Sequence, residues 1–159
     1  MQKNIIPYWL LPNVVQQAKV ILNTYQKITG IALFDSVYSD EYRSYLLYHA
    51  PFVIVSHGTE KDPVFNYANL ISQQLWQIDW ESFTQMPSRL SAEPERAEDR
   101  QRLLDEAAKN GYINNYTGVR ISSAGVRFKI ENVLLCNLID EDKRNIGQAA
   151  IFRSWTYLS

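Results

Sequence analysis

The sequence is poor in the residues that build disulfides and metal sites. Among 159 residues there are one cysteine, Cys136, and two histidines, His49 and His57. A single cysteine excludes an internal disulfide framework and is compatible with a reducing compartment. Because the two histidines do not lie in a recognisable ligand spacing, we do not expect a zinc or non-haem iron site.

The chain also lacks an excess of one charge and a long apolar run. Sixteen basic and seventeen acidic residues give a formal net charge of −1, so no overall field attracts nucleic acid or an anionic membrane. The apolar N-terminal run is broken by Pro7 and Pro12 and is too short to span a bilayer. We therefore predict a cytoplasmic protein that contacts neither nucleic acid nor a membrane directly.

Residues 1–50 are predicted to form an N-terminal helical extension. One amphipathic helix starts at Asn13, with apolar residues at spacings of three and four, and stops at Gly30. A second begins at Ser39 and ends before Pro51. We expect both helices to cover a sheet. The alternative is a dimer seam, which predicts a homodimer through these helices, although two heptads are marginal evidence for it.

Residues 51–159 are predicted to form one α+β domain. The runs FVIVS and PVFNYA, separated by HGTEKD, predict a hairpin. Short helices follow, capped by Asn69 and Asp79, and then a longer acid-rich helix that closes at Gly111. Three strands complete an antiparallel sheet. This order, with helices on one face of a five-stranded sheet, is that of the PAS fold.

The middle strand of the last three carries the clearest alternation. Apolar Val126, Phe128 and Ile130 alternate with charged residues, which indicates one buried and one wet face. If the alternation continues without a bulge, it carries Asn132, Leu134 and Cys136 inward as well. The last strand is expected to run on through IGQAAIFRSWTYL.

Several segments resemble the MEKHLA family, a PAS-related module. The resemblance runs from about Tyr38 to Trp155 and is most specific in MPSRLSAEP and GVRISSAG. It implies a PAS-like sensory or regulatory fold and no assigned reaction, because function lies in sites carried by folds.

The resemblance to PAS modules allows their known cofactors to be weighed by residue type. Flavin photosensors of the light-oxygen-voltage (LOV) type carry a reactive cysteine in an asparagine-cysteine-arginine motif of the helical region, and this chain has no cysteine there. Haem-binding PAS domains commonly place an axial histidine on the long helix, and residues 91–110 contain none. Cysteinyl flavin photochemistry and haem are therefore disfavoured, and the cofactor stays unassigned.

The remaining candidate site is a mostly apolar pocket between sheet and helices. Gln148 lies roughly where flavin-binding relatives place a ring-contacting glutamine, whereas Arg89 is interpreted first as an ion-pair partner of the acid-rich helix. His57 is interpreted first as a turn residue. The candidate lining residues are Asn66, Trp76, Arg89, Phe128, Ile130, Asn132, Leu134 and Gln148, with His57 at the mouth.

Three functions are compatible with these features. We favour a non-enzymatic sensor that binds an unknown small molecule or regulatory protein and signals by contact. The second hypothesis is a homodimerising interaction domain with a solid core. The third is an enzyme with His57 as its base, which needs a carboxylate or hydroxyl within hydrogen-bonding reach.

Overall fold

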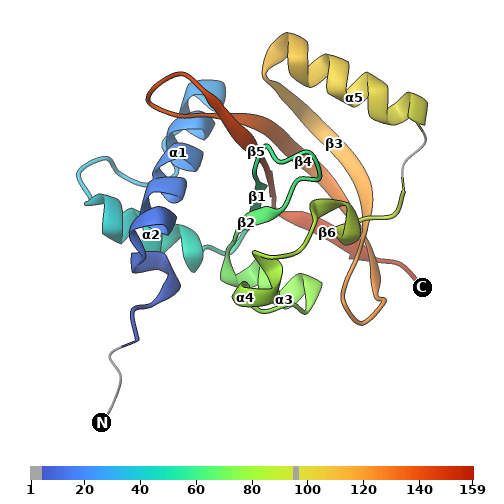
Figure 1. The fold of residues 1–159 in the computed structure, drawn as a ribbon, viewed down its shortest axis with the longest axis horizontal. Coiled ribbons are helices and arrows are strands. Elements are labelled where there is room, and N and C mark those ends of the chain that lie inside the picture. Colours follow the sequence, from blue (N-terminus) through green and yellow to red (C-terminus); the bar gives the residue numbers. More distant parts are fainter. Residues whose placement is uncertain (1–4, 95–96) are drawn as a thin grey trace.

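The computed structural model describes residues 5–94 and 97–159. Figure 1 shows a central sheet with helices on both sides. The helices are α1 (Pro12–Thr29), α2 (Asp40–Tyr48), α3 (Leu70–Trp76), α4 (Trp80–Phe83) and α5 (Ala97–Asn110), with short 3-10 helices η1 (Tyr8–Leu10) and η2 (Ser88–Ser91). The strands are β1 (Val53–His57), β2 (Phe65–Ala68), β3 (Tyr112–Ile121), β4 (Arg127–Ile139), β5 (Asn145–Phe152) and β6 (Ser154–Tyr157).

The sheet is antiparallel and confirms the predicted PAS-like arrangement. Its strand order is β2-β1-β5-β4-β3, and a sixth strand, β6, pairs with the first half of β4. The prediction of one continuous last strand is wrong, because the strand breaks at Arg153. Consequently β5 and β6 pair with successive halves of β4.

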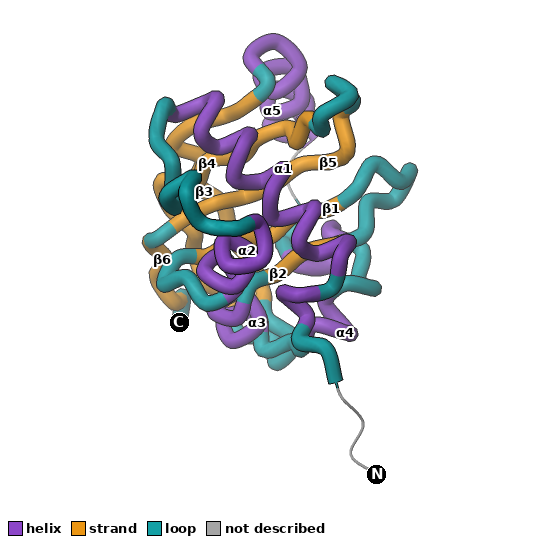
Figure 2. Tube along the Cα trace, turned by 90° about the vertical axis from the view of Figure 1, so that its left-hand side faces the viewer, coloured by secondary structure: helices purple, strands orange, loops and turns teal. Residues whose placement is uncertain are grey.

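Helix α1 covers one face of the sheet, as the sequence predicts for the N-terminal helices. Pro12 stands at its first helical position, where the missing amide proton costs nothing, and Gly30 ends it at a φ of 74°. The apolar stripe, including Val14, Ala18 and Ile21, is buried against the sheet. Figure 2 shows α1 crossing in front of the strands. We call this side the α1 face.

The opposite side, the α5 face, is covered by α3, η2 and α5. Trp76 of α3 is its largest buried side chain and contacts Phe128 with ring centroids 5.2 Å apart. The indole Nε1 of Trp76 donates to the carbonyl oxygen of Ser91, 3.2 Å away, and so ties the η2 segment to the core. Of the helices that were predicted for the PAS domain, α3 and α5 therefore lie on one face, whereas α4 contributes Phe83 to this face and Trp80 to the cluster of the N-terminal helices on the other.

Asn69 connects helix α2, strand β1 and helix α3. Its side chain caps α3, as predicted, by accepting from the amide of Ser72, and it also accepts from the amide of Ile54 in β1. Its amide nitrogen donates to the carbonyl oxygens of Leu47, at 3.2 Å, and Phe52, at 2.8 Å. Because the side chain is fully buried, these contacts satisfy groups that water cannot reach.

A bulge in β4 overturns the predicted alternation of that strand. Asn132 has a φ of 54°, and the β3–β4 register shifts beside it. Asparagine tolerates this left-handed conformation better than most residues. Leu134 and Cys136 therefore pack on the α1 face, whereas Val133 and Leu135 join Phe128 and Ile130 on the α5 face.

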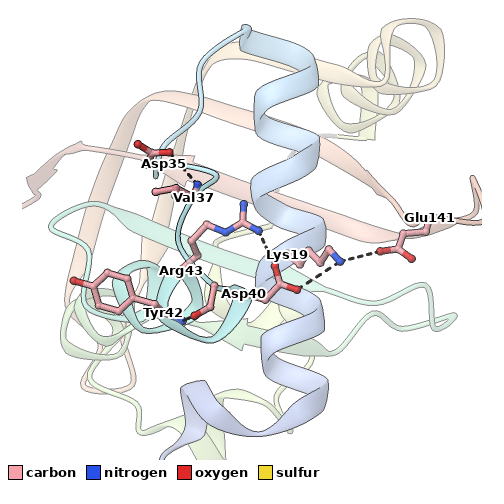
Figure 3. A network of polar contacts seen from close by, with 8 residues as sticks. Lys19, Asp35, Val37, Asp40, Tyr42, Arg43 and Glu141 are labelled. Atoms are coloured by element: carbon pink, nitrogen blue, oxygen red, sulfur yellow. Dashed lines mark hydrogen bonds and ion pairs between the residues drawn. The ribbon is translucent and has the colours of Figure 1, made fainter.

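A polar network ties α1, α2 and the β4–β5 turn together (Figure 3). The Lys19 Nζ lies 3.6 Å from the Asp40 carboxylate and 3.3 Å from that of Glu141. Asp40 also pairs with Arg43 at 2.6 Å. The hydrogen bond from Arg43 is the main cause of a lowered pKa of Asp40, and Lys19 adds to it.

Candidate functional site

A cavity of about 970 Å³ opens between the α5 face, the η2 segment and α5. Strands β1, β5 and β4 form its floor. Leu103, Leu104 and Ala107 of α5 and residues 88–94 form its walls. The cavity is large enough for a drug-sized molecule, and polar side chains are nearly as frequent in its lining as apolar ones.

Three polar side chains form a row across the floor. Gln148 of β5 lies opposite His57 of β1 on one side and opposite Asn137 of β4 on the other. Residues directly opposite one another in antiparallel strands project to the same face, and all three line the cavity. We call this set, His57, Gln148 and Asn137, the polar row.

The next position along the floor is apolar and low. Ala150 lies between Val55 and Leu135 in the same cross-strand order. Because the side chain of Ala150 is only a methyl group, the floor lies low beside the polar row. A flat molecule could therefore lie over Ala150 with one edge against the polar groups.

The polar row keeps hydrogen-bonding capacity. The Nδ1 of His57 donates to the carbonyl oxygen of Gly58, 2.8 Å away, and the Asn137 amide donates to the carbonyl oxygen of Ala107 at 3.3 Å. Within the described residues, the half-buried side-chain amide of Gln148 forms no hydrogen bond. A cavity amide without a protein partner favours a ligand that can both donate and accept.

Gly147 allows β5 to approach β1 at this end of the site. Its φ is 145°, and a Cβ atom built there would collide with the carbonyl oxygen of His57. Only glycine adopts this conformation without strain and leaves this space. The position of Gln148 beside His57 therefore depends on the glycine that precedes it.

Five of the predicted site residues line the cavity and four do not. Phe128 packs beneath Trp76, outside the lining, and Asn66 accepts from the Ser56 hydroxyl at 2.6 Å. Asn132 occupies the bulge and Leu134 faces α1, so the structure brings neither to the cavity. The predicted residues in the lining are His57, Trp76, Arg89, Ile130 and Gln148.

Sequence reasoning missed Asn137, Ala150 and Arg120, which also line the cavity. Asn137 was hidden by the assumed alternation of β4, although an asparagine at position 132 is itself a signal for a left-handed bulge. The suggested partner of Arg89 was also wrong. Its guanidinium pairs with Asp62 in the β1–β2 turn, at 3.2 Å, and with none of the described side chains of α5.

Catalysis by His57, a metal site and thiol chemistry at Cys136 receive little support from the described residues. The only side-chain hydrogen bond of His57 in the described residues goes to its own turn. Nor do three histidine, cysteine or carboxylate side chains in residues 5–94 and 97–159 lie close enough together to hold a metal ion. Cys136 is buried on the α1 face, and burial raises the pKa of its thiol to about 12.

The sequence model of the MEKHLA domain matches residues 15–157. The chain belongs to the MEKHLA family. The match begins at residue 15 rather than near Tyr38, so it includes most of α1. A search of curated protein sequences found no match. Across the part of the chain that the structure describes, no helix is long and apolar enough to cross a membrane.

Solved structures place this MEKHLA chain among PAS folds. A PAS domain from Colwellia psychrerythraea is 16% identical, with a TM-score of 0.59, over 74% of this chain and 95% of that one. A LOV domain from a blue-light activated histidine kinase of Erythrobacter litoralis is 18% identical, with a TM-score of 0.54, over 70% and 99%. An RNA-binding LOV receptor, also 18% identical with a TM-score of 0.54, is covered over 35% of its length and matches 95% of this chain. At these identities the likeness shows the fold alone, which is that of PAS and LOV domains.

Proposed function

We propose that this MEKHLA chain is a sensory module that binds a small molecule in the cavity and signals through its N-terminal helices. The polar row is the main support for the proposal, because it places three hydrogen-bonding side chains beside the low, apolar part of the floor at Ala150. The ligand is a largely flat, apolar molecule with one hydrogen-bonding edge. His57 and Asn137 fix its orientation, and the side-chain amide of Gln148 forms hydrogen bonds with its polar edge.

The same strands link the cavity to α1. In β1, Val55 and His57 line the cavity, whereas the Ser56 hydroxyl accepts from Gln17 of α1 at 3.1 Å and donates to Asn66. A ligand that moves β1 or β5 therefore changes the surface on which α1 rests. It shifts the packing of the N-terminal helices only to the extent that it binds the two arrangements with different affinity.

A cavity-filling substitution tests the binding site. The neutral fluorescent probe N-phenylnaphthylamine is expected to bind the wild-type chain with one-to-one stoichiometry. Ala150→Trp should abolish binding while circular dichroism stays unchanged, because the indole fills the space over the floor. Ala124→Trp, at an exposed turn position, is the matched control and should bind like wild type. Equal binding by wild type and Ala150→Trp would exclude the cavity as the site.

The outer surface of α2 favours a second function, interaction with a protein. Tyr38, Tyr42 and Tyr45 are 44, 45 and 41% exposed and contact one another in a continuous aromatic strip. Because the apolar stripe of α1 is buried within the chain, we expect a homodimer or regulator to use this strip instead. Light scattering should then show a larger species for wild type than for Tyr42→Glu, and equal masses would exclude self-association through α2.

A further inference from the structure

We propose that the cavity ligand carries an anionic group and that Arg120 binds it. This inference rests on the proposed small-molecule site and adds a second recognition element to it. Arg120 lies in β3 opposite Phe128, whose side chain is on the α5 face. The arginine is half-buried and lines the same cavity as the polar row.

Local contacts hold the guanidinium of Arg120 in place without neutralising it. The guanidinium carbon lies 5.6 Å from the centre of the Tyr116 ring, and Nη1 donates to the carbonyl oxygen of Val119 at 3.1 Å. In residues 5–94 and 97–159, Arg120 forms no ion pair with a carboxylate. A planar donor fork in a partly dry cavity is suited to a carboxylate or another oxyanion.

Gly118 makes the space for this arrangement. A Cβ atom at that position would lie 2.5 Å from the Tyr116 hydroxyl and 2.9 Å from Arg120 Nη1. Any side chain there would have to displace the Tyr116 ring or the guanidinium and so disturb their contact. Glycine in the interior of a strand commonly marks such a close approach.

The charge balance of the lining also favours an anion. Among the lining residues that the structure describes, the two carboxylates are those of Asp62 and Glu93, and they already pair with Arg89 and Arg127. The lysine and arginine side chains that remain in this described part of the lining are exposed Lys61 and half-buried Arg120. A cation removed from water without a counter-ion is costly, and an anionic ligand group offsets that cost.

Two fluorescent probes that differ by one anionic group test the assignment. Anilinonaphthalene sulfonate carries a sulfonate, and N-phenylnaphthylamine is its uncharged counterpart. Arg120→Gln should weaken binding of the sulfonate probe roughly tenfold or more, the size of a lost charge-assisted hydrogen bond, and leave the neutral probe unchanged. Arg120→Lys should recover part of the affinity. Gly118→Ala should act like Arg120→Gln on the sulfonate probe.

Arg153→Gln is the matched control, because Arg153 lies outside the lining and its guanidinium stacks on Phe52. It should leave both affinities unchanged. Equal loss for both probes in Arg120→Gln, or no loss for either, would overturn the anionic subsite while leaving the cavity as a binding site. If the wild-type chain binds neither probe, the small-molecule site itself fails and the subsite falls with it.

Discussion

The two faces of the sheet are built from alternate residues of the same strands, yet they pack differently. On the α1 face, Leu134, Cys136 and Ala149 close against α1 with at most 7% exposure. On the α5 face, neighbouring Leu135, Asn137 and Ala150 border a cavity of about 970 Å³. A solid layer supplies stability, and this leaves the opposite face free to hold unfilled space for function.

The largest effect is expected where the faces are joined. Asn69→Ala removes contacts to α2, β1 and α3 and leaves buried backbone groups unpaired, which should lower the free energy of unfolding by about 3 kcal/mol. Urea denaturation measures this change. Asn66→Ala, the same substitution at an exposed site, should cost less than about 1 kcal/mol. Similar losses in the two variants would contradict the role of Asn69 as the joint.

Two adjacent alanines test the contrast between the faces directly. Ala149→Leu inserts atoms into the packed α1 face and should destabilise the protein by about 2 kcal/mol. Ala150→Leu extends into the cavity and should change stability by less than about 0.5 kcal/mol. Thermal unfolding of both variants measures the difference. A reversed order would show that the α5 face, and not the α1 face, is the tightly packed one.

The smallest effect is expected in the surface network of the N-terminal helices. The folded pKa of Asp40 lies below its unfolded value of about 3.9, so its stabilisation is present above that pH and is lost as pH falls through the folded pKa. Because the side chain is 39% exposed, this amounts to roughly 0.5 kcal/mol. Asp40→Asn should therefore lose less stability than wild type between about pH 4 and pH 2. Parallel curves of stability against pH would contradict this pairing.

Element order, helix caps and strand positions could be predicted from local chemistry. Asn69 and Asp79 each cap the helix that the sequence assigned to them, whereas Asn13, the predicted cap of the first helix, lies inside α1, which begins at Pro12. These signals are local because each cap bonds an amide three residues further on. The resemblance to the MEKHLA family also rested on short continuous segments, MPSRLSAEP and GVRISSAG, and it is confirmed.

The lining of the site could be predicted only in part, because it depends on register. Gln148 and His57 were identified as candidates from their places in single strands. Their alignment with Asn137 follows from pairing between three strands. The bulge at Asn132 determines which residues in the second half of β4 face the cavity and which face α1. Arg120 could be proposed as an anion-binding residue only once the structure showed that Asp62 and Glu93 pair with other arginines. Neither kind of information is contained in the spacing of one segment.

The bulge at Asn132 also fixes the chemical character of the cavity. It inserts one extra residue between Ile130 and the second half of β4, so the phase of every later side chain is inverted. If the same sequence paired as a regular strand without the bulge, the neighbours Cys136 and Asn137 would exchange places between the two faces. A one-residue change of phase thus separates a cavity with an amide in its floor from one with a thiol there, without any change in the sequence.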